Sequence, residues 1–293
     1  MSLGSREALG AGSPPSLNVG HLFPTIVLAD GRLRIPTELP PDPLCRPVRL
    51  EDLELDDELA ESGATIEYTL ASLRRMAALL VQSGSATQER DEPYVTHPAC
   101  PYPLLRCTLP NLPAPQPTHT LDIHFLDTHE VYRTHVHGLV WALQSPRLPQ
   151  LSKRWSSSSA GVAGEQTALL PVVTLELPHR PAWPLLHRYL YDGSPAQLLN
   201  NLLTTPTPLP PPTSSATPGG QALSAAQQRD LDSLLIRLMR VREVWLDAAA
   251  LELSDVALWA TLRRAWDVLV ADLGELAADI PGSKIPGRNE EAV

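Results

Sequence analysis

Histidine and cysteine side chains are the first candidates for chemistry in this sequence. Five of the nine histidines fall within nineteen residues: His119, His124, His129, His135 and His137. His135 and His137 would share one face of a strand, and a His-x-His pair can chelate zinc. His97, Cys100 and Cys107 add ligand types, but their spacing matches no compact zinc module, which uses closely spaced pairs of cysteines. We therefore expect surface and turn histidines, with one histidine held in the core, and no metal site.

Signatures of catalysis are missing from the sequence. It contains no Gly-rich phosphate loop, no G-x-S-x-G nucleophile elbow and no H-E-x-x-H pair. Cys100 lies in THPACPYP, but the sequence marks no histidine as its general base. We expect no catalytic residue and no cofactor, which leaves a small zinc-dependent enzyme as the least favoured reading.

The composition describes a folded, acidic chain with irregular segments. Of 293 residues, 43% are hydrophobic and 31 are proline, about twice the usual share of proline. The formal net charge of −10 opposes direct binding to a nucleic acid backbone. Three cysteines are too few for a disulfide framework, and no apolar run is long enough to cross a membrane. We expect a protein of the nucleus or cytoplasm without membrane contact.

The first 120 residues predict a tail and an extension. Residues 1–20 are rich in Gly, Ser and Pro and predict a mobile tail, and residues 21–120 form the extension. Within the extension, Asp30-Gly31 between two apolar runs predicts a hairpin. The proline-rich residues 85–119 predict an irregular connection.

An acidic run and a helix lie between the hairpin and that connection. Residues 51–61 hold seven acids and no base, either as a solvated face or as a contact for a basic partner. Apolar spacings of three and four then predict one helix over about 62–82. Gly84, just past the expected end, has the position of a C-terminal cap.

The sequence pattern of residues 121–203 predicts a small α+β core. Leu121, Ile123 and Phe125 alternate with polar residues, which is typical of a half-buried strand. A short polar turn separates them from an antiparallel partner. The expected elements are strands over 121–125, 130–135 and 172–177 and helices over 138–143, 183–191 and 197–203.

The C-terminal part predicts two long helices. A Pro-rich linker over 204–221 leads into an antiparallel helical hairpin over 222–280, and residues 281–293 form a second tail. Ser254-Asp255 is expected to begin the second helix, with the Ser oxygen as N-cap. Three tryptophans on the apolar faces are candidate partner-binding residues: Trp245, Trp259 and Trp266. We expect Trp266 in the core, and of these two residues Trp245 is the better candidate to keep an exposed edge for a partner.

The middle of the chain resembles the BTB/POZ fold. The order strand, strand, short helix, strand, helix is that of a BTB domain, and the helix ends in a pattern similar to L-x-x-Y/F-L-Y-x-G. The matching positions are Leu175, Leu177, Trp183, Leu186, Tyr189, Leu190, Tyr191 and Gly193. Either His135 or His137 fits the family's histidine position, so the register of the second strand stays open.

A second resemblance covers more of the chain. The core together with VREVWLDAAAL and DVALWATLRRAWDVLVADL is similar to the clampless-type developmental regulators of mushroom-forming and smut fungi. That resemblance implies a regulator of sexual development after mating, without catalysis, which contacts transcription factors of the mating pathway.

These observations give an α+β protein with a divergent BTB/POZ-like core and a C-terminal helical hairpin. The favoured function is protein–protein interaction in the regulation of fungal sexual development and clamp formation. The first alternative is a BTB-type adaptor that brings substrates to a cullin ubiquitin ligase. The partners expected are therefore transcription regulators or a cullin-type ligase, and a homodimer is left open.

Overall fold

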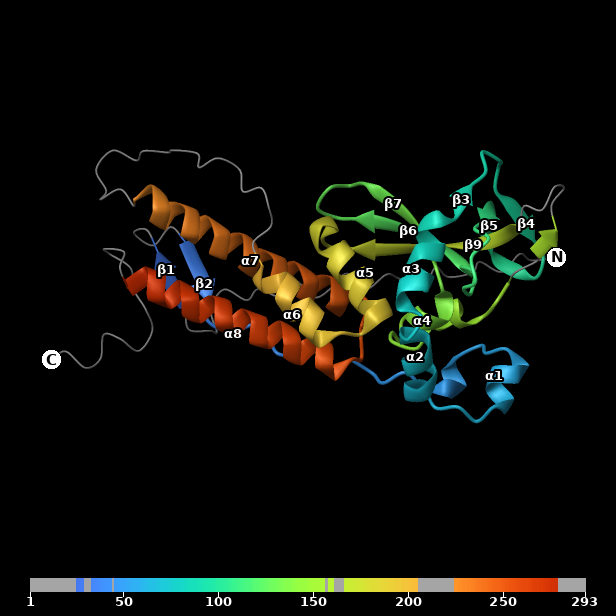
Figure 1. Cartoon of the computed structure of the whole chain (residues 1–293), viewed down its shortest axis with the longest axis horizontal. Coiled ribbons are helices and arrows are strands. Elements are labelled where there is room, and N and C mark those ends of the chain that lie inside the picture. Colours follow the sequence, from blue (N-terminus) through green and yellow to red (C-terminus); the bar gives the residue numbers. More distant parts are fainter. Residues whose placement is uncertain are drawn as a thin grey trace, which may run out of the picture.

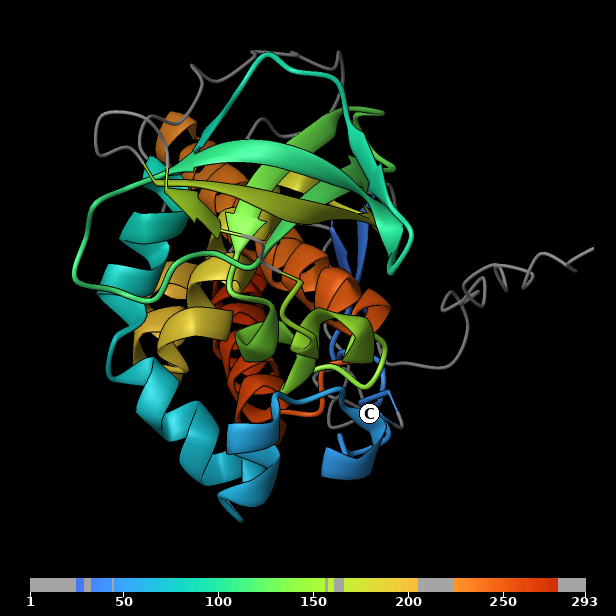
Figure 2. The same ribbon diagram turned by 90° about the vertical axis from the view of Figure 1, so that its right-hand side faces the viewer.

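A curved sheet lies over a layer of helices in an α+β arrangement (Figures 1 and 2). The computed structural model describes residues 25–28, 33–43, 45–155, 158–160, 166–204 and 224–278. The predicted tails lie outside these residues, and so does the predicted linker apart from Thr204. The sheet has the strand order β3-β5-β9-β6-β7, with β4 on β5 and β8 on β9.

The N-terminal segment holds a hairpin and three α-helices. The elements are β1 (Thr25–Leu28), β2 (Leu33–Pro36), α1 (Asp57–Glu61), α2 (Ile66–Arg74) and α3 (Ala77–Ala86). The antiparallel pairing of β1 with β2 confirms the predicted hairpin. The single helix predicted over 62–82 is wrong, because the chain breaks at Arg75 and Met76 into α2 and α3.

Gly84 does not cap a helix. It is buried inside α3, and a Cβ there would stand 2.5 Å from the carbonyl oxygen of His135. Thr87 ends the helix instead, with its amide bonded to the carbonyls of Ser83 and Gly84. The glycine therefore allows α3 to approach strand β7, which is a long-range requirement.

The irregular connection predicted over 85–119 is wrong. This segment contains β3 (Gln88–Glu89), β4 (Val95–His97) and β5 (Cys100–Leu109), and the last is a ten-residue strand. Its prolines, Pro101 and Pro103, precede the residues that pair with β9, which begin at Leu104. They therefore lie where the strand has only the short β4 as a neighbour, and proline is tolerated there.

The predicted core strands are present. They are β6 (His119–Phe125), β7 (Val131–Val136) and β9 (Gln166–Leu177), joined by α4 (Gly138–Ala142), the 3-10 turn Pro149–Ser152 and β8 (Ser158–Ala160). Strand β6 pairs antiparallel with β7 and parallel with β9. His135 of β7 pairs with Thr120 of β6, and His137 lies after the strand, at the N-cap of α4. This pairing fixes the register of β7 that the sequence left open.

Helix α5 (Trp183–Asp192) confirms the expected helix and its cap. The seven apolar and aromatic positions of the predicted signature are all buried. Two of them, Leu175 and Leu177, lie on β9, and the other five lie on α5. Gly193 has φ of 57°, and its amide donates to the Tyr189 carbonyl at 2.8 Å. A Cβ on Gly193 would stand 2.2 Å from the Arg74 guanidinium, so both backbone conformation and space require glycine.

The C-terminal elements are α6 (Pro195–Leu203), α7 (Ala225–Ala250) and α8 (Val256–Ala278), which confirms the predicted helical hairpin. Ser224 and Gln227 form a capping box at the start of α7. Helix α8 is capped by Asp255 and not by Ser254: Asp255 Oδ1 accepts from the amide of Ala257 at 2.9 Å. None of the described helices is long and apolar enough to cross a membrane.

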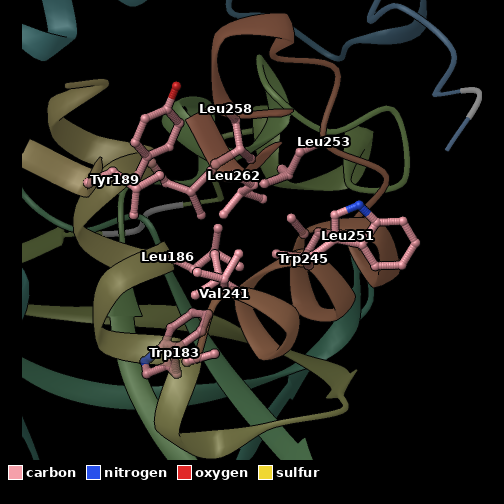
Figure 3. Close-up of a cluster of buried hydrophobic side chains, with 14 of the residues drawn as sticks. Trp183, Leu186, Tyr189, Val241, Trp245, Leu251, Leu253, Leu258 and Leu262 are labelled. Atoms are coloured by element: carbon pink, nitrogen blue, oxygen red, sulfur yellow. The ribbon is translucent and has the colours of Figure 1, made fainter. Parts of the chain in front are cut away.

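One apolar cluster joins the N-terminal hairpin, the helix-facing side of the sheet and the three C-terminal helices. Figure 3 shows its centre, where Leu186 on α5 meets Val241 on α7 and Leu262 on α8. A smaller cluster around Cys107 and Leu170 covers the opposite face of β5 and β9. The alternation of β9 explains this division, because Leu170 and Val173 point to opposite faces.

Candidate functional site

The buried histidines in and next to the sheet form hydrogen bonds that hold the structure together. His119 Nδ1 lies 2.9 Å from the Thr118 hydroxyl, and His135 Nδ1 lies 3.0 Å from that of Thr120. Burial lowers the pKa of His119 and of His137 to about 4, so both rings are neutral at pH 7. Within the part of the chain that the structure describes, no three His, Cys, Asp or Glu side chains are grouped to hold a metal ion.

His137 is held from both sides. Its Nε2 lies 3.0 Å from the Pro115 carbonyl oxygen and 3.1 Å from the Ser83 hydroxyl, and its Nδ1 lies 3.2 Å from the Tyr191 hydroxyl. The ring thus ties α3 and the segment before β6 to the end of α5. The expectation of a single core histidine is wrong, because His119, His135 and His137 are all buried.

Two of the three cysteines, Cys45 and Cys107, have thiols with raised pKa values. Cys107 is fully buried, and burial raises the pKa of its thiol to about 12, so it is protonated at pH 7. The pKa of the Cys45 thiol is also raised. Burial is the largest cause, and the nearby carboxylates of Glu252 and Asp42 add to it. All three cysteines are free thiols.

The three candidate tryptophans lie in the core. Trp245, Trp259 and Trp266 are each 4% exposed, and the rings of Trp245 and Trp259 meet edge to face at 6.0 Å. Trp266 has the core position expected for it, whereas the exposed edge expected for Trp245 is wrong. The wide apolar faces of α7 and α8 are covered by one another and by α5 and α6. These three tryptophans are therefore not exposed for contact with a partner in the folded protein.

A cavity of about 210 Å³ opens where α1, α2 and α3 approach α4. We call it the α1–α4 cavity. Its wall is apolar at five leucines: Leu55, Leu59, Leu73, Leu80 and Leu139. A second, more open hollow of about 670 Å³ adjoins it and shares Leu55, Asp56 and Arg154 with it. This outer hollow is completed by Glu54, Asp57 and Lys153, so an apolar recess opens onto a charged surface.

Carboxylates dominate the surface beside the α1–α4 cavity. Two acids of the run 51–61 are paired: Glu51 with Arg49 at 3.3 Å and Glu54 with Lys153 at 2.7 Å. Five exposed carboxylates of this region have no cationic partner among the described residues: Asp52, Asp56, Asp57, Glu61 and Glu67. We call these five the acidic rim. The rim leaves a local excess of negative charge next to the apolar recess.

A polar cluster fixes the α2 wall of the cavity to the rest of the protein. Arg74 Nη2 donates to Asp255 Oδ2 at 3.2 Å and to Gln144 Oε1 at 3.1 Å, and the Tyr189 hydroxyl donates to Asp255 Oδ2 at 3.0 Å. Gln144 Nε2 in turn donates to the carbonyls of Val140 and Leu190. These bonds join α2, α4, α5 and α8, and they hold Leu73, the neighbour of Arg74, at the cavity.

One buried carboxyl lies on the other side of the core. Asp247 on α7 is fully buried, and its Oδ1 accepts from the His179 amide at 2.9 Å while its Oδ2 has no partner. Burial, reinforced by the carboxylates of Asp127 and Glu243, raises the pKa of Asp247 to about 8. The side chain is therefore largely protonated at pH 7.

Comparison with known proteins gives two matches that follow one another along the chain. The model of the clampless protein 1 N-terminal domain matches residues 43–178, and that of the C-terminal domain matches residues 196–291. Clampless protein 1 of Cryptococcus neoformans var. neoformans serotype D, from strains JEC21 and B-3501A, is 30% identical over 124 residues. That alignment covers 42% of this chain and 24% of each relative, so the matched part is about a quarter of their length.

No solved structure matches the chain, so the BTB/POZ resemblance stays a prediction. The two domain models together cover more than half of the residues, in the order in which the family carries them. The acidic rim, α4 and the sheet lie within the first model, and α7 and α8 lie within the second. This chain belongs to the clampless protein 1 family.

Proposed function

We propose that this protein is a non-enzymatic regulator of fungal sexual development that acts through contacts with other proteins. The observation that carries this proposal is the match to both domains of the clampless protein 1 family. The mating-type pathway and clamp formation are the processes in which we expect it to act, in the nucleus or cytoplasm, with transcription regulators as partners. The net charge of −10 favours protein partners over a nucleic acid backbone.

The state of the ionisable side chains supports a role without catalysis. General acid–base catalysis needs a group with a pKa near the working pH and access to a substrate. The buried histidines His119 and His137 have lowered pKa values and form structural hydrogen bonds, and the thiol of Cys107 has a raised pKa. Asp247 titrates nearer to neutrality but is fully buried in the core. Elemental analysis of the purified protein tests the alternative of a zinc enzyme, which requires about one zinc per chain.

A cullin-ligase adaptor is the second candidate, because the arrangement of the sheet is similar to that of a BTB core. Strand β6 pairs antiparallel with β7 and parallel with β9, with α4 before β9 and α5 after it, which is similar to the order of a BTB core. Many BTB proteins recruit substrates to cullins, and the same core also serves in transcriptional regulators. The sheet alone does not separate these two roles.

Proximity labelling in the native cell separates the candidates. The full chain is fused to a biotin ligase and expressed from its own promoter during mating, with the ligase alone at matched abundance as the control. Enrichment of transcription regulators of the mating pathway supports the regulator, and enrichment of a cullin supports the adaptor. A labelled set that is no different from the control would contradict both.

A further inference from the structure

We propose that the α1–α4 cavity binds a basic segment of a partner protein, with one apolar side chain in the cavity and Lys or Arg side chains on the acidic rim. The inference rests on the proposed function, because it assumes that the protein acts through protein contacts. It assigns those contacts to one surface and gives the partner a chemistry.

The size and lining of the cavity favour a side chain as its occupant. Pockets for small molecules and cofactors measure about 300–1,000 Å³, whereas this cavity measures about 210 Å³ and has five leucines in its wall beside several polar residues. Anchoring side chains at protein interfaces fill apolar recesses of this kind and are surrounded by a polar rim. We therefore assign the cavity to a single Leu, Met or aromatic side chain of a bound segment.

A polar group in the wall can orient such a segment. Gln116 lines the cavity, and its Nε2 donates to the Pro110 carbonyl at 2.9 Å. Its Oε1 is buried and has no hydrogen-bond partner. A buried acceptor without a partner is costly, and rotation of the Gln116 amide toward the cavity would let a backbone N–H of a bound segment satisfy it.

The charge around the cavity selects a basic partner. Asp56 borders both hollows and Asp57 borders the outer one, and the other carboxylates of the acidic rim lie near them in the sequence, on the 3-10 turn Leu50–Asp52, α1 and α2. The cations among the described residues here are fewer: Arg49 and Lys153 are engaged with Glu51 and Glu54, and Arg154 lines both hollows. Complementary charge steers binding and excludes like-charged partners. A second copy of this chain carries the same net charge of −10, which disfavours self-association at this site.

Selection of peptides against the full chain tests the inference. A displayed random peptide library is selected with the wild-type protein, and synthetic peptides from the enriched set are titrated by fluorescence anisotropy. We expect enriched peptides with several Lys or Arg residues around one large apolar residue. Enrichment of acidic or neutral peptides, or the absence of enrichment, would overturn the proposal.

Matched variants then show whether the site is the one assigned here. Asp56→Lys/Asp57→Lys should weaken binding of the enriched peptides by about tenfold or more. Asp267→Lys/Asp272→Lys, which changes two exposed carboxylates of α8 by the same charge, should change it by about threefold at most. An equal loss in both variants means that the peptides respond to net charge alone, and the proposal is then wrong.

Leu59→Glu separates the apolar anchor from the electrostatics. The substitution adds negative charge beside the acidic rim, so binding driven by charge alone would strengthen. Filling of the cavity by an apolar side chain predicts the opposite, a loss of about tenfold. Circular dichroism checks that each variant is folded, and the lysine pair provides the test if Leu59→Glu is not.

Two further outcomes keep this inference distinct from the proposed function. If proximity labelling captures mating regulators equally with wild type and with Asp56→Lys/Asp57→Lys, the proposed function stands and the assignment of the surface is wrong. If sedimentation shows a dimer of the wild-type protein that this variant disrupts, the cavity is an interface between copies, and the basic-partner proposal is wrong.

Discussion

Removal of the Asp255 carboxylate should destabilise the protein by about 3 kcal/mol, because one side chain performs two tasks. Its Oδ1 caps α8 through the amide of Ala257, and its Oδ2 accepts from Arg74 and Tyr189. Loss of an N-cap costs about 1 kcal/mol. The side chains of Asp255 and Arg74 are 21% and 25% exposed, so we discount their bonds for solvent screening and assign about 2 kcal/mol to the pair of bonds.

A graded series of variants separates the two tasks. Asp255→Ala should lose about 3 kcal/mol of unfolding free energy, and Asp255→Ser, which keeps a capping oxygen, should lose about 2. Asp255→Asn keeps the cap and an acceptor for Tyr189 but loses the ion pair, so it should lose about 1 kcal/mol. Asp272→Ala, at an exposed position of the same helix, is the control and should stay within about 0.5 kcal/mol of wild type.

Urea unfolding followed by circular dichroism provides the measurement, with equal m-values as the condition for comparing variants. A double-mutant cycle with Arg74→Ala should give a coupling of about 1 kcal/mol. Equal losses in Asp255→Asn and Asp255→Ala would refute the assignment of a cap. A loss below about 0.5 kcal/mol in Asp255→Ala would refute the account of this cluster.

Three other substitutions test the core. Trp266→Ala should cost about 3–5 kcal/mol and lower the melting temperature and the soluble yield, since its ring is 4% exposed. Gly193→Ala should cost about 1–2 kcal/mol, measured by urea unfolding, because φ is 57° and Arg74 occupies the space of a Cβ. Asp247 has a folded-state pKa of about 8 against an ordinary value of 3.8, so its contribution to stability is complete below pH 4 and falls as the pH rises to 8. The stability of Asp247→Asn relative to wild type should therefore rise by up to about 1.4 kcal/mol per pH unit in this window, and no pH dependence of that difference would contradict the raised pKa.

Elements defined by local periodicity could be predicted from the sequence. The apolar stripes of α7 and α8 repeat at three and four residues, and the pattern from Trp183 to Gly193 contains both the buried face and the left-handed cap of α5. In these segments the residues that decide the structure are neighbours along the chain. The same holds for the β1–β2 hairpin.

The predictions that were wrong concern segments whose structure depends on contacts between residues far apart in the sequence. Pro101 and Pro103 suggested an irregular segment, but β5 uses them where it has no β9 partner. Gly84 suggested a cap, but its role is the contact of α3 with His135. The α1–α4 cavity joins leucines of segments about eighty residues apart in the sequence, and only the acidic run beside it gave a local signal.

Sexual development in cells that carry a surface variant tests the central claim, that this protein regulates by contacting other proteins. The native gene is replaced by wild type, Asp56→Lys/Asp57→Lys or the control Asp267→Lys/Asp272→Lys, and clamp formation after mating is scored at equal protein abundance. The account predicts normal development with the wild type and the control, and loss of clamp formation together with loss of partner labelling in the cavity variant. Normal clamp formation in cells that lack the protein altogether would contradict the account.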